Sequence, residues 1–174
     1  LSGCNLSNAI LYNATLTGAN LTNTILDNAN VELANFSNAN FTNISATSVS
    51  QASNVSSWPN EKYFVINDKI IGPGVNLTGA DLTGANLENA DLTNANLSDA
   101  ILNHGTPLVN SVLIGVNLSN ADLRGAYLNN ANLLNSNLNQ AQLLGAELIG
   151  IKSGNISGNL QNLPDNYSLV NGFI

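Results

Sequence analysis

The chain has 174 residues, of which 44% are hydrophobic while only 9% are charged and 5% are aromatic. Asn (34 residues) and Leu (27 residues) are so abundant that an ordinary close-packed core and a charge-rich disordered chain are both excluded, and a repeat is indicated. Four Lys and Arg residues against eleven Asp and Glu residues give a net charge of −7, which excludes the basic stripe of a direct nucleic-acid binder. No apolar run reaches the roughly 18 residues of a transmembrane helix.

The first residues contain the single cysteine, Cys4, which allows neither an internal disulfide nor a thiolate-rich metal site. Leu1-Ser2-Gly3-Cys4 is similar to the cleavage box of bacterial lipoproteins, but Cys4 also fits a small-residue slot of the repeat described next. We favour the repeat interpretation. Because the chain does not begin with Met, we expect a removed signal segment or a trimmed start.

A period of five residues runs through 1–43 and resumes over 76–150, giving 23 units. Leu, or in a few units Val or Phe, stands at every fifth position, and a small residue, mostly Ala, stands two positions earlier. Five matches neither the 3.6-residue period of a helix nor the two-residue period of a strand. It matches a short extended stretch whose small and large apolar side chains both point inward, with an outward Asn or Asp between them.

Each unit ends with the chemistry of a turn. Two residues after the large apolar position stands Gly or Asn in 19 of the 23 units. A type II turn needs a positive φ at its third position, which Gly adopts freely and Asn tolerates. A turn every five residues makes the chain coil around its own core. The exceptions are Leu33, Asp99, His104 and Gln140.

Residues 44–75 interrupt the repeat. Tyr63–Ile66 and Lys69–Ile71 predict two short strands around an Asn-Asp turn. We expect an inserted loop whose hairpin protrudes from a corner of the coil. Two separate solenoids are the alternative to one continuous stack, and we rank them second because they would expose extra open ends.

Within the second block, one extra residue separates Leu102 from Leu108. We predict a one-residue bulge at a corner, near 103–107, that leaves the inward side chains in place. His104 is the only histidine, and it has no Cys, His or carboxylate at ligand spacing. We therefore predict a turn residue here and no metal ligand.

Residues 151–174 depart from the period again. Asn171-Gly172 is a strong hairpin signal, and the segment around it echoes the earlier hairpin. We expect a C-terminal cap or a truncated hairpin, because an open coil end presents a bare strand edge.

Gly-Ala-Asp-Leu-Thr-Gly-Ala-Asn-Leu at 79–87 matches the Ala-(Asp/Asn)-Leu-x-x motif of the pentapeptide-repeat family, which about two thirds of the chain resembles. The resemblance implies an all-β fold, a right-handed quadrilateral β-helix of about six coils with type II turns at its corners. The hairpin followed by Gly-Pro-Gly-Val-Asn-Leu at 72–77 is similar to cyanobacterial and thylakoid members of the family. This implies a photosynthetic source, with a periplasm or thylakoid lumen if a leader was removed and the cytoplasm otherwise.

No catalytic constellation is found, and we predict no enzyme, no cofactor and no metal site. Paired carboxylates would need a cleft, which a convex coil does not offer. Most outward positions are Asn, Thr or Ser, but a few are apolar, and an exposed apolar patch marks a contact. Either the C-terminal segment folds back over this patch, or a homodimer or another protein covers it. The candidate contact residues are Val109, Ile114, Tyr127, Leu134, Leu144 and Ile149.

The sequence thus predicts a non-enzymatic structural or protein-interaction module. The alternative is a DNA mimic that inhibits a type II topoisomerase, as relatives of the resembled fold do. Such mimicry needs a dense column of carboxylates at phosphate-like spacing. The stacked positions Asp81, Ile101, Asp122 and Gln142 alternate acid with neutral residues, which argues against it.

Overall fold

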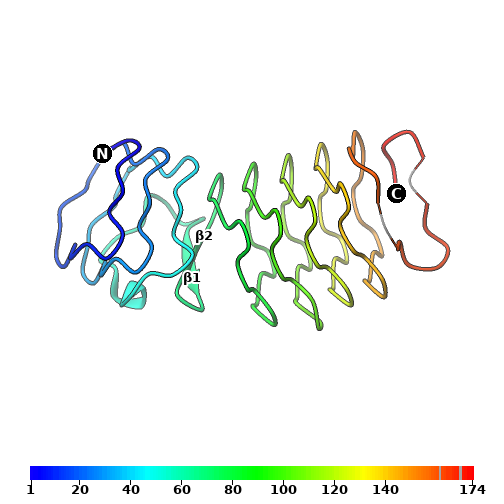
Figure 1. Cartoon of the computed structure of the whole chain (residues 1–174), viewed down its shortest axis with the longest axis horizontal. Helices are drawn as coiled ribbons and strands as arrows, with labels where there is room; N and C mark the ends of the chain where they lie inside the picture. The colour runs from blue at the N-terminus through cyan, green and yellow to red at the C-terminus, as the bar shows by residue number, and fades with distance from the viewer. Residues whose placement is uncertain (161, 169) are drawn as a thin grey trace. The chain divides into compact units, whose positions relative to one another are not determined.

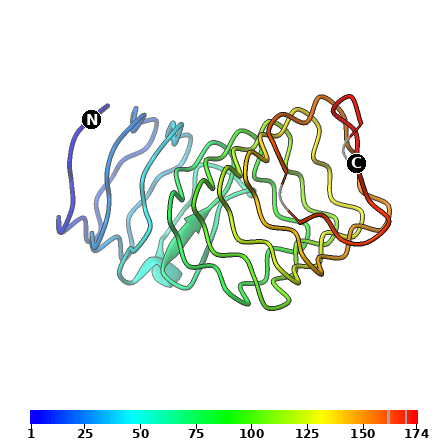
Figure 2. The ribbon, with the colours of Figure 1, turned by 45° about the vertical axis from the view of Figure 1, so that its right-hand side comes forward.

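The computed structural model describes residues 1–160, 162–168 and 170–174, and it divides into two compact units, Leu1–Asn76 and Leu77–Ile174. Gln161 and Leu169 belong to the predicted C-terminal cap and lie outside the described residues. Within each unit the backbone winds in stacked coils (Figures 1 and 2). Among the described residues, the elements longer than a single bridge are η1 (Ala52–Asn54), β1 (Phe64–Ile66) and β2 (Lys69–Ile71).

Parallel bridges hold successive coils together. They join residues twenty positions apart, such as Asn5 with Ile25 and Asn117 with Asn137. Because each repeat unit has five residues, twenty residues make four units, and each coil therefore has four sides. The backbone N–H groups donate to the carbonyls of the next coil, as in Leu6 N to Ile25 O at 2.8 Å.

The corners have the predicted turn geometry. All 23 predicted turn positions have a positive φ between 53° and 72°, including the four that are neither Gly nor Asn. A hydrogen bond closes each regular corner, for example from Ala9 N to Leu6 O at 3.0 Å. A positive φ at the third position with this bond is the geometry of a type II turn.

Apolar side chains fill the coils. In the second unit, every central leucine from Leu77 to Leu148 is at most 2% exposed, and most of the preceding small residues are buried alanines. Leu6, Leu11 and Leu16 in the first coil are only half-buried, because only one coil lies against them. The core is therefore a narrow column of leucine and alanine that depends on stacking.

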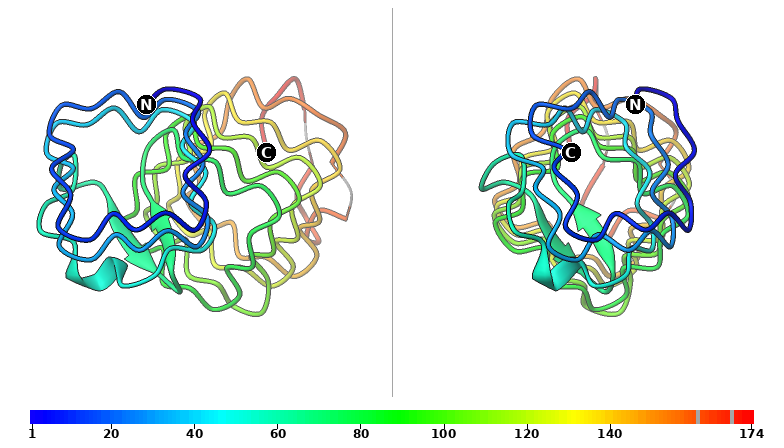
Figure 3. Two further views of the ribbon diagram at one scale, coloured as in Figure 1. Left: turned by 60° about the vertical axis from the view of Figure 1, so that its left-hand side comes forward. Right: turned by 90° about the vertical axis from the view of Figure 1, so that its left-hand side faces the viewer.

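The hairpin in the insertion differs from the sequence expectation in one respect. β1 pairs antiparallel with β2 around Asn67 and Asp68, whose φ values are 48° and 59°. However, the hairpin is docked and does not protrude: Ile70 and Ile71 are fully buried. Val49 N donates to Asp68 O (2.6 Å), and Figure 3 shows the strands against the last coil of the first unit. Two consecutive apolar residues in β2 favour this burial.

Aromatic rings from the insertion extend the core of the first unit. Trp58 stacks on Phe36 with ring centres 5.9 Å apart. Tyr63 meets Phe41 edge-on at 5.3 Å. A Cβ atom at Gly72 would lie 2.2 Å from Cδ1 of Tyr63, so the tyrosine ring occupies the space that a side chain at Gly72 would need.

The corner near 103–107 contains the extra residue. Bridges across it join residues 21 positions apart, as in Ile101 with Asp122. His104 (54°) and Gly105 (80°) both have a positive φ, so this corner has two left-handed residues where a regular corner has one. The inward side chain of Thr106 is fully buried, and its hydroxyl donates to Asn103 O at 2.8 Å.

A short antiparallel turn lies against the last coil of the second unit. Val170 bridges Phe173 around Asn171-Gly172, whose φ values are 50° and 82°. Ile156 N donates to Gly172 O at 3.0 Å. The Ser153 hydroxyl accepts from Ile174 N (3.2 Å), so the turn pairs polar backbone groups at the coil edge.

Candidate protein-contact surfaces

On each side of the second unit, the outward side chains of successive coils stack in two columns. The first column holds the residues just before the central leucines, and we number the four sides by these residues. The bridges join Asn96, Asn117 and Asn137 on side 1; Asp81, Ile101, Asp122 and Gln142 on side 2; Pro107, Tyr127 and Glu147 on side 3; and Asp91, Val112, Asn132 and Lys152 on side 4. The second column of each side lies two residues later in the sequence.

Side 1 is a ladder of asparagine side chains. Asn137 Nδ2 donates to Asn117 Oδ1, and Asn117 Nδ2 donates to Asn96 Oδ1, each at 3.0 Å. Asn117 Oδ1 also accepts from Ser119 N at 3.2 Å, which fixes the start of the turn. In the sequence these residues were predicted to be hydrated surface, and the ladder was not predicted. Recurrence of Asn once in each coil, at 96, 117 and 137, is the signal that would have revealed it.

Side 2 contains an ion pair at the bulge. Arg124 Nε and Nη2 donate to the two carboxylate oxygens of Asp122, each at 2.8 Å. Asn103 Nδ2 donates to Asp122 Oδ2 at 2.7 Å. These hydrogen bonds, led by Arg124, hold the pKa of the Asp122 carboxyl well below its usual range, although burial acts in the opposite direction. Arg124 therefore compensates one of the two acids in this column.

His104 lies in the same corner, exposed to solvent, with its Nδ1 beside Asn103 Oδ1. Within the described part of the chain, no three His, Cys, Asp or Glu side chains gather as a metal site would require.

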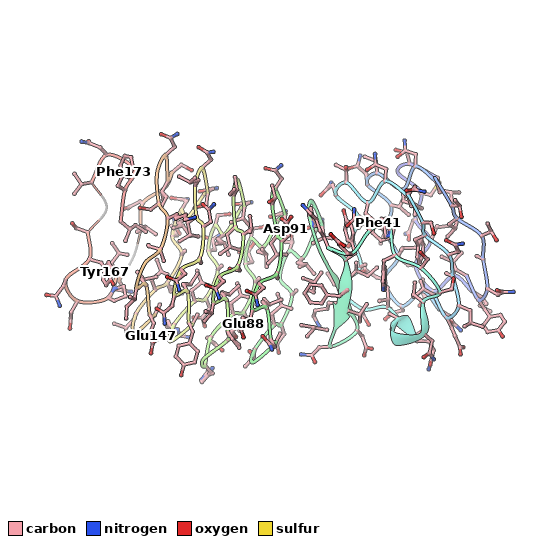
Figure 4. The ribbon with its side chains drawn as sticks, turned by 180° about the vertical axis from the view of Figure 1, so that it is seen from behind. Phe41, Glu88, Asp91, Glu147, Tyr167 and Phe173 are labelled. Atoms are coloured by element: carbon pink, nitrogen blue, oxygen red, sulfur yellow. The ribbon has the colours of Figure 1, made fainter. Side chains whose placement is uncertain are left out.

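Glu147 lies on side 3, with exposed apolar residues before it and after it in the chain and on the preceding coil. Leu144 is 60% exposed at the preceding corner, and Ile149 is 69% exposed two residues further on. Tyr127, 42% exposed, is bridged to Glu147 from the coil before. Figure 4 shows Glu147 on the same edge of the unit as Glu88. We call Tyr127, Leu144 and Ile149 the Glu147 cluster.

Side 4 has a separate apolar strip. Ile114 and Leu134 are outward neighbours on successive coils, since Gly115 N donates to Leu134 O at 2.9 Å. A Cβ atom at Gly154, one coil further, would lie 3.1 Å from Cδ2 of Leu134 and 3.2 Å from Cε1 of Phe173. The Phe173 ring therefore continues the column in the place of a side chain at Gly154.

The six residues singled out in the sequence thus fall on three sides. Ile114 and Leu134 lie together on side 4, and three others form the Glu147 cluster. Val109 lies on side 3 but two coils from Ile149, with Asn129 between them. Phe173, which reaches side 4 from the C-terminal turn, was not among the predicted contact residues. Five apolar residues of the first unit are exposed as well and were not predicted as contacts: Leu1, Ile10, Tyr12, Ile25 and Leu33.

Comparison with protein families settles the class of the chain. The family described as Pentapeptide repeats matches in eight copies, over residues 1–38, 14–49, 74–105 and 108–152. The chain belongs to the pentapeptide-repeat family. Its four-sided coil is the right-handed quadrilateral β-helix of that family.

Solved pentapeptide-repeat structures are similar to this chain. Rfr23 from the cyanobacterium Cyanothece 51142 is 39% identical over 50% of this chain and 59% of its own length, with a TM-score of 0.48. HetL, involved in heterocyst differentiation regulation in Nostoc sp. strain PCC 7120, is 24% identical over 90% of this chain and 88% of its own, with a TM-score of 0.42. A thylakoid lumen pentapeptide-repeat protein of Arabidopsis thaliana is 25% identical over 84% of this chain and 69% of its own, with a TM-score of 0.33.

A search of the curated proteins finds no match to this pentapeptide-repeat chain. In the described residues, no helix has the length and apolar character needed to cross a bilayer.

Proposed function

We propose that this pentapeptide-repeat protein is a non-enzymatic protein-binding module, and that the Glu147 cluster carries its contact with a partner. The observation behind the proposal is the exposure of Leu144 and Ile149, at 60% and 69%, on a coil whose other outward positions are polar residues or glycine. Burying one such side chain in a partner contributes about 1.5–3 kcal/mol. Few residues can therefore supply most of the binding free energy.

The charge in the cluster indicates the chemistry of the partner. Glu147 lies between the apolar side chains, and its Oε2 accepts from Asn129 Nδ2 at 2.8 Å, which holds the carboxylate on the surface. A partner that places a Lys or Arg beside an apolar pocket would match this arrangement. Because a parallel bridge to Tyr127 fixes the backbone at Glu147, little conformational entropy is lost on binding.

A DNA mimic that inhibits a type II topoisomerase is the alternative, and the structure offers it little support. On side 2, the acids Asp81 and Asp122 alternate with Ile101 and Gln142. Arg124 also forms an ion pair with Asp122, which reduces the net negative charge of this column. A supercoiling assay with a type II topoisomerase tests the alternative, which requires inhibition that declines with added salt.

A pull-down from an extract of the source organism, with the immobilised chain as bait, tests the partner-binding proposal. We expect a captured protein that resists a rising salt gradient and is lost with Leu144→Asp and with Ile149→Asp. Ser119→Asp on side 1 adds the same charge away from the cluster and should retain the partner. Equal capture by all three variants would contradict the role of the cluster.

The photosynthetic source and the location, a periplasm or thylakoid lumen, remain predictions from the sequence resemblance. Fractionation of the source organism, with the chain detected by antibody, distinguishes these compartments from the cytoplasm.

A further inference from the structure

We propose that side 4 of the second unit is a self-complementary surface that binds a second copy of this chain in antiparallel orientation. This goes beyond the partner binding proposed above, which depends on the Glu147 cluster on sides 2 and 3. The two surfaces can be changed separately.

The first observation is the order of residues along side 4. Bridges connect Asp91, Val112, Asn132 and Lys152, so these residues stack in one column, one from each of four consecutive coils. We call the levels of these four coils on a side its first to fourth rungs. The column has an acid on its first rung and a base on its fourth. Asp91 Oδ1 accepts from both the N–H and the hydroxyl of Thr93, at 3.0 and 2.7 Å, which keeps the carboxylate on the outer surface.

The second observation is the apolar strip beside this column. Ile114 and Leu134 occupy the second and third rungs, and Phe173 takes the fourth in place of a side chain at Gly154. Leu134 is 36% exposed and Phe173 is 56% exposed. The second column of side 4 is therefore apolar from the second rung to the fourth, and the first column has opposite charges at its two ends.

A two-fold axis between the second and third rungs, along the strand direction, reverses the order of the coils in the second copy. The first rung of one copy then lies opposite the fourth rung of the other, and the second rung lies opposite the third. Each column faces the same column of the other copy. Asp91 then faces Lys152 of the partner subunit, and Ile114 faces Leu134 of the partner subunit. Because the interface is two-fold, each of these pairs occurs twice.

Charge selects this orientation and this side. A parallel dimer would place the two Asp91 carboxylates on one level and the two Lys152 ammonium groups on another, so like charges would repel. Side 3 carries an acid at each end, Glu88 on its first rung and Glu147 on its fourth, and none of its outward residues is a base, so an antiparallel pairing there would bring acids together without an opposite charge. Figure 4 shows these two glutamates along one edge of the unit, with Asp91 and Phe173 above them.

The size of the surface predicts a weak dimer. Four rungs at roughly 4.8 Å spacing extend over only about 14 Å, so the buried area falls below that of a standard stable interface. The apolar strip supplies the affinity, and the paired charges fix the orientation and make the dimer sensitive to salt.

Sedimentation velocity of the whole chain, over a concentration series at low and high salt, tests the proposal. We expect reversible dimerisation that weakens at high salt. Leu134→Asp should abolish the dimer, whereas the same substitution at Leu144, outside side 4, should leave it unchanged. Since Leu144→Asp removes the partner contact proposed earlier, failure of one proposal is distinguishable from failure of the other.

The charge pairs allow a sharper test that uses outward positions only. Asp91→Lys and Lys152→Asp should each raise the dimer dissociation constant by roughly three- to tenfold at low salt, because each creates two like-charge contacts. An equimolar mixture of these two variants should form a heterodimer tighter than either homodimer, since both contacts are then between opposite charges. The double variant should dimerise like the original chain.

Thermal melts of all variants check that folding is unchanged, and the charge variants decide the question if Leu134→Asp unfolds. A chain that stays monomeric at every concentration would overturn the proposal. So would a mixture of the charge variants that dimerises no more tightly than each variant alone.

Discussion

A single asparagine side chain on this coil satisfies two structural needs. Asn117 Oδ1 accepts the N–H of Ser119 within its own turn, and it also accepts Nδ2 of Asn137 from the next coil. An aspartate at such a position can accept the turn N–H, as Asp81 does from Thr83 at 3.0 Å, but it has no amide to donate along the ladder. Asparagine, unlike aspartate, can therefore serve both the turn and the ladder.

Unlike the asparagine side chain, two buried serine hydroxyls satisfy no hydrogen-bonding need. Ser111 Oγ and Ser136 Oγ are buried in the small-residue slots and have no hydrogen-bond partner among the described residues. A buried hydroxyl without a partner costs roughly 1–3 kcal/mol. We therefore expect Ser136→Ala to raise the free energy of unfolding by about 1 kcal/mol, measured by urea denaturation.

Thr106→Val is the matched control for this serine variant. The Thr106 hydroxyl is equally buried, but it donates to Asn103 O at 2.8 Å and accepts from Gly84 N at 3.1 Å. Its removal should lower stability, because it leaves Gly84 N unpaired. A loss of stability in Ser136→Ala would show that its hydroxyl is satisfied in solution.

The small slots also limit side-chain volume. Ala131 is fully buried between the leucine columns of the second unit. Ala131→Leu should overpack this interior and lower the free energy of unfolding by about 1–3 kcal/mol in a chemical melt. Thr83→Leu adds a similar side chain at an exposed position and should be nearly neutral. An equally small effect for both would contradict the core assignment.

At the scale of the turn, Leu33 is the residue least suited to its position. Its φ is 56°, and a branched side chain in this left-handed region costs about 1–2 kcal/mol relative to a residue that tolerates it. Leu33→Asn should therefore raise the free energy of unfolding by about 1 kcal/mol. Urea denaturation measures the change.

Asn13 gives the reciprocal test, because it occupies the same corner one coil earlier with a φ of 54°. Asn13→Leu should lower stability by a similar amount. If Leu33→Asn proves neutral or destabilising, the exposed leucine makes a compensating contact in solution.

The bulge makes stability depend on pH through Asp122. Its pKa is lowered from the ordinary value near 3.8, first by Arg124, so the folded state favours the charged carboxylate. The stabilisation is complete above pH 3.8 and is lost as the pH falls through the lowered pKa of the folded state. We expect the stability difference between the original chain and Asp122→Asn to be constant near neutral pH and to shrink below pH 4. Denaturation at several pH values, with Asp99→Asn as the control, measures it.

The elements differ in how far the sequence could predict them. The coil and its turns follow from local rules, so even Leu33 and Gln140 have the expected positive φ. The docking of the hairpin does not follow from local rules, because it depends on the fit of the Tyr63 ring over Gly72. Likewise, the period of five placed Ile114 and Leu134 together, but nothing local could bring Phe173 beside them.

At the scale of the whole molecule, both units end with the same device. In the first unit, an antiparallel turn with two consecutive positive φ values, at Asn67 and Asp68, pairs with the last regular coil. In the second unit, the turn at Asn171-Gly172 does the same. The similarity between the two sequence segments therefore reflects the same structural requirement, since an unpaired coil edge would present free N–H and C=O groups to other strands.

Removal of residues 170–174 tests this capping role. The deletion takes away the acceptor of Ile156 N and the hydrogen bonds between Ser153 and Ile174, and it uncovers Gly154. Because neighbouring coils stabilise each other, the last coil should fray first, and the loss should amount to about 1–3 kcal/mol. We expect a lower melting temperature by circular dichroism and faster hydrogen exchange at the Ile156 amide, while amides of the inner coils keep their protection.

Gly172→Val keeps the full length but places a branched residue at a φ of 82°, so it should reproduce the faster exchange at Ile156. Unchanged exchange at this amide in both variants would mean that the turn does not cap the coil in solution.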